Sequence, residues 1–288
     1  MQKIIIDCDN TFGVEGCDLD DGLAIIYALG TGRAELLAVT TTFGNNTLEV
    51  ITPNTIDFMK KIGRDSIPVY PGHADDHRQN KAAAFLAETV SKYPREVSIL
   101  ATGSLTNLYH AWLLDPAFFD KIKALSCMGG VTEPLVIMGK ELSELNFSCD
   151  STAAFHVLTR GNNITIATGN VCLGALFTKE RFDKMEQSEA PFLRWLCSKG
   201  QYWFEREHVY FGHGGIYKWD VYAAAALLCP ELFAARRVEI TPDAGSMKTG
   251  MLLGGGKRHT VNIPVLKDSG VYIEHVYEAY ARFAEQDT

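Results

Sequence analysis

The first 22 residues restrict the fold more than any other part of the chain. Residues 3–22, KIIIDCDNTFGVEGCDLDDG, open with three consecutive isoleucines, which are typical of a buried strand. A polar loop with two glycines follows, and the apolar pattern of residues 23–29 then predicts a helix. A strand that leads through a loop into a helix is the unit from which open α/β sheets are built.

Five aspartates are concentrated in this one connection, at Asp7, Asp9, Asp18, Asp20 and Asp21. Open α/β sheets bind their ligands at this end of the strands. Two unit charges ~4 Å apart repel each other by roughly 4 kcal/mol at an effective dielectric constant near 20. Converging carboxylates therefore predict either a bound cation or raised pKa values. The alternative is that Asp20 and Asp21 only begin a helix, where negative side chains suit the N-terminus.

Strands and helices alternate along the first two thirds of the chain. Further strands are predicted at 36–43, 67–70, 97–101, 125–128 and 164–167, and extended segments at 235–266. Helices are predicted at 82–91, 105–114, 151–160, 221–228 and 269–285. Residues 178–208 are predicted to be largely helical, and residues 131–149 are expected to form a functional loop with short elements. The alternation predicts one α/β, Rossmann-like domain over residues 1–288, with a mostly parallel central sheet and helices on both faces.

Composition excludes several classes of function. The net charge of −8 disfavours a nucleic-acid or anionic-membrane partner. No apolar run approaches the ~18 residues of a membrane span, and the first strand leaves no room for a signal peptide. The seven cysteines are scattered without a CxxC pair, which favours reduced thiols and a cytoplasmic location.

Other predicted strand ends also supply oxygen ligands and amides. These residues are Asn45, Thr102, Glu144, Asn146, Asp150 and Asp220. Carboxylates together with carbonyl oxygens are the ligands of hard cations, calcium above all. Each position also has a structural alternative, because Asn45 suits a turn, Thr102 a helix entry, and Asp150 and Asp220 the N-caps of helices. For Asp150 the structural role is the better interpretation.

Residues 7–11, DCDNT, also resemble the opening DxDxT motif of haloacid-dehalogenase-type phosphatases. In that family the first aspartate is a nucleophile and the second a general acid or base, with magnesium as cofactor. Asp7 and Asp9 would take these roles. The later acidic element of that family has no clear counterpart in residues 150–288, since the acidic pair here follows Asp9 by only 11 residues.

The complete series of motifs resembles the inosine-uridine nucleoside hydrolase family, whose members cleave the N-glycosidic bond of ribonucleosides. The family's opening motif, DxDxxxDD, is matched in order by four of the five aspartates. The resemblance continues through AVTTTFGNNTL, ILATGSLTNL, LSCMGG, ELNFSCDSTAA and YKWDVYAAA, and covers residues 3 to about 230. It implies a calcium-dependent hydrolase that acts on small nucleosides and commonly forms homodimers or homotetramers.

The resemblance also implies a role for individual residues. Asp9, Asp21, Asp220 and the backbone carbonyl of Thr102 match the calcium ligands. Asp9 further matches the general base that deprotonates a calcium-bound water, and the transition state is oxocarbenium-like, as in glycoside hydrolysis. The residues that match positions binding the ribose are Asp20, Asn45, Glu144 and Asn146.

The leaving base is expected to lie near Trp219. The Trp219–Asp220 pair resembles the purine-preferring branch, in which indole stacking activates the leaving group; the alternative is a tryptophan packed over a helix start. His208 and His213, with Tyr202 and Trp203, are further candidates for lining the base pocket.

Three departures from the family pattern accompany the resemblance. Ten residues separate Asp9 from Asp20 where the family has three, and Asp18 therefore competes with Asp20 for its role. The sequence HADDHRQN replaces the family's His-Gly element, and an asparagine expected upstream of Glu144 is missing. The hypothesis is a calcium-dependent hydrolase with a preference for purine nucleosides. The alternatives are the phosphatase and a non-catalytic protein that binds ribosides.

Overall fold

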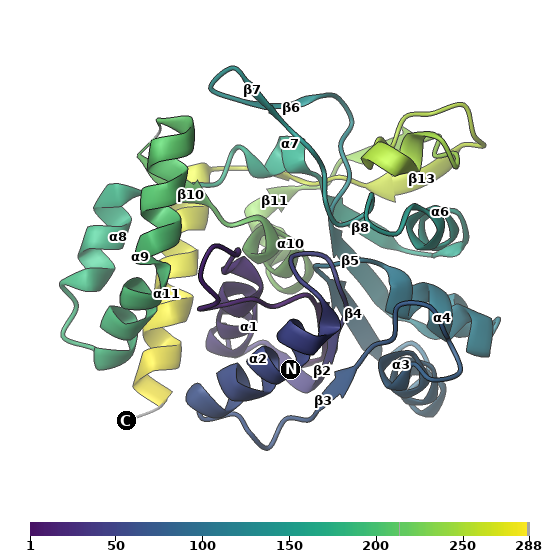
Figure 1. Ribbon diagram of the computed structural model, residues 1–288, viewed down its shortest axis with the longest axis horizontal. Coiled ribbons are helices and arrows are strands. Elements are labelled where there is room, and N and C mark those ends of the chain that lie inside the picture. Colours follow the sequence, from purple (N-terminus) through teal and green to yellow (C-terminus); the bar gives the residue numbers. More distant parts are fainter. Residues whose placement is uncertain (213, 287–288) are drawn as a thin grey trace.

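The central sheet has eight strands in the spatial order of an open Rossmann-like fold (Figure 1). The computed structural model describes residues 1–212 and 214–286. From one edge to the other, the strands are β12 (Arg237–Ile240), β13 (His259–Asn262), β8 (Ile164–Ala167), β5 (Ala124–Met128), β4 (Val97–Ala101), β1 (Gln2–Cys8), β2 (Ala34–Thr41) and β3 (Val69–Pro71). Neighbouring strands are parallel except β12 and β13, which are antiparallel. The predicted fold class is confirmed.

The three isoleucines of β1 show how the sheet divides the core. Successive side chains of a strand point to opposite faces, so Ile4 and Ile6 join one hydrophobic cluster and Ile5 joins the other. The first cluster includes residues of α1 (Asp20–Gly30), α2 (Leu48–Lys61), α8 (Lys179–Glu186), α9 (Pro191–Phe211), α10 (Trp219–Leu228) and α11 (Ser269–Gln286). The second includes residues of α3 (Lys81–Lys92), α4 (Thr106–Leu114), α5 (Phe118–Lys121) and α6 (Ser151–Arg160). Helices therefore cover both faces, as predicted.

Short elements complete the chain at the carboxyl end of the sheet and its margins. They are the hairpin of β6 (Leu135–Ile137) and β7 (Lys140–Leu142), the pair β9 (Leu176–Thr178) and β10 (Gly215–Tyr217), the pair β11 (Phe233–Ala234) and β14 (Val265–Leu266), the helix α7 (Gly169–Cys172), and the 3₁₀ turns η1 (Pro230–Leu232) and η2 (Ser246–Thr249). None of the helices among the described residues is long and apolar enough to cross a membrane.

Two predicted segments contain more than one element. The largely helical segment 178–208 contains two helices, because α8 ends at Glu186 and α9 begins with Pro191, whose fixed backbone suits a first helical turn. The segment 131–149 includes the β6–β7 hairpin. The N-cap role of Asp150 is confirmed, because its carboxylate accepts a hydrogen bond from the amide of Ala153 at 2.9 Å.

The strand order reverses direction between β1 and β4. The chain first proceeds from β1 to β2 and β3, and then returns to place β4 on the other side of β1. The connection after β1 leads to α1 on one face of the sheet, and the connection after β4 leads to α4 on the other face. A crevice therefore opens between them, beyond the carboxyl ends of these strands. Ligands of open α/β sheets bind at such a point.

Candidate active site

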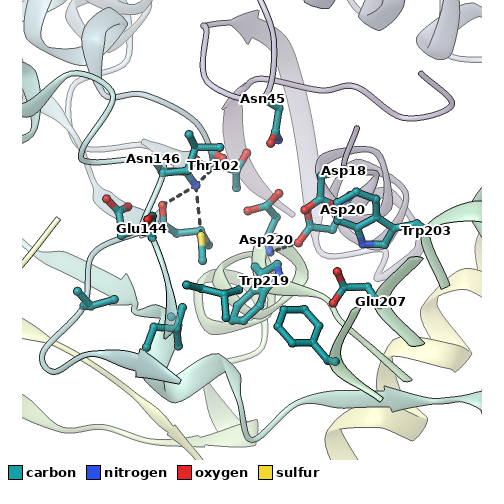
Figure 2. A pocket seen from close by; sticks show the side chains of 18 of the residues that line it. Asp18, Asp20, Asn45, Thr102, Glu144, Asn146, Trp203, Glu207, Trp219 and Asp220 are labelled. Carbon is teal, nitrogen blue, oxygen red and sulfur yellow. Dashed lines mark hydrogen bonds between the residues drawn. The ribbon is translucent and has the colours of Figure 1, made fainter. Parts of the chain in front are cut away.

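A cavity of about 440 Å³ lies beyond the carboxyl ends of β1, β4 and β5 (Figure 2). It is lined by most of the polar residues singled out in the sequence together with an aromatic wall. The lining residues used below are Asp18, Asp20, Asn45, Thr102, Glu141, Glu144, Asn146, Trp203, Arg206, Glu207, Tyr210, Phe211, Trp219 and Asp220. Most of the polar residues meet here because they follow a strand end or begin a helix at the same edge of the sheet, whereas α9 contributes its residues from one helix face.

Three buried carboxylates converge at one side of the cavity, and two of them, Asp20 and Asp220, line it. Asp20 and Asp21 begin α1 and Asp220 lies in the first turn of α10, and their ligand atoms lie within 4.8 Å of one another. The two helix starts are joined directly, because the amide of Asp220 donates to Oδ2 of Asp20 at 3.0 Å. Burial, together with the charges of Asp20 and Asp21, raises the pKa of Asp220 well above its usual range.

Asp9 lies beside this cluster, is fully buried and is not among the residues that line the cavity; the loop after β2 holds it. The backbone amide of Asn45 donates to Asp9 Oδ2 at 2.5 Å, and its side-chain amide donates to Oδ1 at 3.3 Å. Burial raises the pKa of Asp9 to about 6, and burial followed by the charge of Asp9 raises the pKa of Asp21 well above its usual range. Asp9 and Asp21 are therefore close enough to influence each other's ionisation.

These carboxylates form no ion pair with a described residue; the buried Lys218 is influenced by the charge of Asp20, but burial lowers the pKa of Lys218 to about 7. The ion pairs found among residues 1–212 and 214–286 all involve other acids. Several buried carboxylates without a paired cation are costly, and they fit a bound metal ion with oxygen ligands. Thr102 lies beside these oxygen ligands. Its hydroxyl donates to Asp21 Oδ1 at 2.7 Å, and its backbone carbonyl accepts a hydrogen bond from the Asn146 side-chain amide at 3.0 Å.

The opposite side of the cavity carries Glu144 and Asn146. Glu144 accepts hydrogen bonds from the backbone amides of Gly130, Phe147 and Ser148 at 2.8–3.0 Å, which fixes both carboxylate oxygens. The Asn146 side-chain amide donates to the carbonyls of Thr102 and Met128, which leaves its side-chain oxygen as an acceptor for a ligand. The expected sugar-binding residues are therefore rigidly held.

The aromatic wall of the cavity comes from α9 and the start of α10. Five residues of α9 line it, at the helical spacing of one face: Trp203, Arg206, Glu207, Tyr210 and Phe211. Trp219 lies at the start of α10, with its ring 5.0 Å from that of Tyr217. Trp203 and Trp219 are thus brought to the cavity as expected. His208 is exposed, five positions beyond Trp203, and does not line it, while His213 lies outside the described residues.

The ten residues between Asp9 and Asp20 form a loop that is attached to α9. The Tyr202 hydroxyl donates to the carbonyls of Val14 and Cys17, and Arg206 donates to the carbonyl of Gly16. Asp18 Oδ1 accepts from the amides of Leu19 and Asp20 at 2.5 and 3.2 Å. Asp18 and Asp20 both line the cavity, but only Asp20 belongs to the three-carboxylate cluster.

Asp7 does not line the cavity. It is fully buried, and its Oδ1 accepts from the Thr40 hydroxyl at 2.6 Å and from the Asn107 amide at 2.7 Å. These contacts hold β1 to β2 and to α4. The phosphatase alternative therefore has no nucleophile at the cavity.

Sequence comparisons identify a family to which this chain is similar along most of its length. The family model described as "Inosine-uridine preferring nucleoside hydrolase" matches residues 4–273. A probable uridine nucleosidase 1 from Oryza sativa subsp. japonica is 28% identical over 280 residues, covering 87% of this chain and 84% of that protein. The inosine-uridine preferring nucleoside hydrolase of Leishmania major is 26% identical over 284 residues, covering 87% and 86%.

The fold is also that of solved nucleoside hydrolases. The purine-preferring ribonucleoside hydrolase from Gardnerella vaginalis superposes with a TM-score of 0.85 at 22% identity, covering 99% of this chain and 100% of that one. The resemblance seen in the ordered motifs is thereby confirmed. This chain belongs to the inosine-uridine preferring nucleoside hydrolase family.

Proposed function

We propose that this protein hydrolyses the N-glycosidic bond of ribonucleosides in a calcium-dependent reaction, with purine nucleosides favoured, to give ribose and the free base. The observation that carries the proposal is the meeting, at one cavity, of an aromatic wall and a buried carboxylate cluster that forms no ion pair with a described residue. The carboxylate cluster suits a metal ion and a sugar, and the aromatic wall suits a flat base. Membership of the family supports the reaction class.

Asp9, Asp21, Asp220 and the carbonyl of Thr102 are the proposed holders of the calcium ion. Their fit rests on burial and on raised pKa values, since each carboxylate is destabilised in its charged form until positive charge arrives. All proposed ligand atoms are oxygens, as calcium prefers. A bound calcium ion would supply positive charge that lowers the pKa of a neighbouring water and orients the sugar.

Asp9 is the proposed general base. The two hydrogen bonds from Asn45 fix its carboxylate, so that it can accept the proton of a water that attacks C1′ of the ribose. A bond forms between the water oxygen and C1′, the C1′–N bond breaks, and its electron pair leaves with the base. Positive charge develops on the sugar in this step and is stabilised by the surrounding carboxylates.

The remaining polar residues position the ribose. Asp20 and Asn45 are proposed to hold the 2′- and 3′-hydroxyls, and Glu144 and Asn146 to bind the rest of the sugar. Three backbone amides hold Glu144 in its orientation. On the opposite side of the cavity, the hydrogen bond from the Asp220 amide holds the carboxylate of Asp20. A sugar held between two rigid walls loses little further freedom on reaching the transition state.

Trp219 supports the purine preference. An indole at the cavity wall offers a stacking surface, and stacking contributes ~1–3 kcal/mol per base, more for a larger ring. The named relatives include uridine nucleosidases as well as a purine-preferring hydrolase. The preference therefore rests on this residue.

A cytoplasmic location is part of the proposal and is supported by seven free thiols, five of them buried. A homodimeric or homotetrameric state is proposed from the family alone.

The test is the release of reducing sugar from a panel of purine and pyrimidine ribonucleosides, with and without a calcium chelator. Sugar release that the chelator removes and calcium restores is expected, with the highest kcat/KM on purine nucleosides. The Asp9→Ala variant should keep the wild-type circular dichroism spectrum and lose turnover. A folded wild-type protein that binds ribosides but releases no sugar would instead favour the non-catalytic alternative. An active Asp9→Ala variant would show that Asp9 is not the general base.

A further inference from the structure

Glu207 is a cavity-lining acid to which the reaction above assigns no role. It lies on the α9 face that also carries Trp203 and Phe211, and it is half-buried. In the view of Figure 2, Glu207 lies between Trp219 and Trp203, on the opposite side of Asp220 from Glu144 and Asn146. A base stacked against Trp203 or Trp219 would lie beside Glu207 in this view (Figure 2).

The surroundings of Glu207 favour its neutral form near pH 7. Burial first and then the charge of Asp18 raise the pKa of Glu207 to about 7, against the opposing effect of Arg206. Tyr217 of β10 faces the same carboxyl, since burial and then Glu207 raise the pKa of its hydroxyl. Across the cavity, β7 contributes Glu141. Glu207 is therefore surrounded by groups that mostly disfavour its ionisation.

The other acids that line the cavity are already engaged or exposed. The acids concerned are Asp18, Asp20, Glu141, Glu144, Glu207 and Asp220. Asp20 and Asp220 belong to the carboxylate cluster, and Glu144 is fixed by three backbone amides. Asp18 accepts two backbone amides, and Glu141 is exposed on β7. Among the described residues, Glu207 is the acid best placed to give a proton to a ligand at the aromatic wall.

We propose that Glu207 is the general acid that protonates the leaving base. The proposal rests on the proposed hydrolase function. As the C1′–N bond breaks, its electron pair passes to the base, and the carboxyl proton of Glu207 passes to a ring nitrogen of that base. The proton of the attacking water goes to Asp9. Both carboxyl groups then return to their starting states by exchanging one proton each with solvent, so that one water is consumed for each base and ribose released.

A proton donor at this position answers a chemical need of the reaction. A nucleobase that departs as an anion is a poor leaving group, and general acid catalysis typically contributes ~10²–10⁴-fold in rate. The rings of Trp203, Trp219 and Phe211 can stack on the base, but they have no proton of suitable acidity to transfer. Glu207 supplies it on the same face of α9. The acid form is the active one, so kcat/KM should fall as the pH rises through about 7.

The test compares Glu207→Gln with wild-type protein on two substrates, inosine and p-nitrophenyl β-D-ribofuranoside. Nitrophenolate is a stable anion that leaves without a proton, so its release does not need the acid. For inosine we expect kcat/KM to fall by ~10²–10⁴-fold and the alkaline decline to disappear. For the nitrophenyl riboside we expect little change, which also shows that the variant is folded. The matched control is Glu205→Gln on the same helix, whose carboxylate is exposed and bonded to Gln201.

Three outcomes would overturn the proposal. If Glu207→Gln keeps wild-type activity on inosine, Glu207 is not the general acid. If the variant loses activity equally on both substrates, Glu207 maintains the shape of the site and does not transfer a proton. In both cases the active wild-type enzyme leaves the proposed hydrolase function intact. A wild-type protein that cleaves neither riboside, with calcium present, overturns the hydrolase function itself and this proposal with it.

Discussion

Replacing Gly44 by alanine should displace the carboxylate of Asp9, the proposed general base, without changing that side chain itself. Gly44 precedes Asn45 in the loop after β2, and a Cβ atom added there would lie 2.1 Å from Asp9 Oδ2 and 3.2 Å from Asp9 Cγ. The backbone of Gly44 does not have the positive φ that favours glycine, so alanine can adopt it. The cost of the substitution therefore falls on the contact with Asp9.

The magnitude follows from this distance. A carbon and an oxygen in ordinary contact lie more than 3.0 Å apart, so the 2.1 Å approach requires a movement of about 0.9 Å. Because the Asn45 amide hydrogen-bonds to the same oxygen, the carboxylate cannot move without losing that bond. A misplacement of ~1 Å at a reacting group can cost ~10²-fold in rate. Overpacking of this kind lowers the free energy of unfolding by ~1–3 kcal/mol.

The assay is kcat/KM for base release from a purine nucleoside, with urea denaturation of the same samples. Gly44→Ala should lose ~10²-fold in kcat/KM while remaining folded. The control is Gly174→Ala, where the nearest atom to the added Cβ is Val171 O at 3.5 Å, an ordinary contact. Wild-type kcat/KM in Gly44→Ala would refute the reasoning, because it would show that the position of the Asp9 carboxylate does not limit the reaction.

Two further substitutions separate structural from catalytic roles. Asp7→Ala leaves the Thr40 hydroxyl and the Asn107 amide without their buried acceptor, so the free energy of unfolding should fall by ~1–3 kcal/mol for each group. Urea denaturation measures this, and unchanged stability would contradict it; phosphate release that depends on Asp7 would revive the phosphatase. Trp219→Ala removes a stacking surface worth ~1–3 kcal/mol, so KM should rise roughly tenfold to hundredfold, and more for inosine than for uridine. Steady-state kinetics on both nucleosides test this, and an equal effect on the two would remove the purine preference.

Local patterns were sufficient to predict the sheet and the strand-end side of the site. The isoleucines of β1 are fully buried on both faces, which is why their apolar run was a clear signal. Asp9 follows β1 directly and Asp20 and Asp21 begin the next helix, so their meeting with Thr102 after β4 follows from the parallel arrangement of neighbouring strands. The geometric cluster contains Asp20 beside Asp21 and Asp220, and Asp9 lies next to it, held by Asn45.

The base side of the cavity could not be predicted from local pattern. Periodicity predicted a helix over this segment but not which of its faces would line a cavity, because that depends on packing against the loop of residues 10–19 through Tyr202 and Arg206. His208 was singled out for its chemistry and lies outside the cavity lining, while Glu207, one position earlier, lines it. A single glutamate in a helix carries no signal until burial and the neighbouring charge of Asp18 are known.

The central claim is that Asp9, Asp21 and Asp220, with the carbonyl of Thr102, hold a calcium ion required for breaking the N-glycosidic bond. Its most direct test is the rate of base release from inosine by metal-stripped protein as calcium is added back, for wild type and for Asp220→Asn. We predict no turnover without metal, saturable recovery in the wild type, and a much weaker recovery in Asp220→Asn, whose amide removes one charge from the cluster. Full turnover by the metal-stripped wild-type protein would contradict the account.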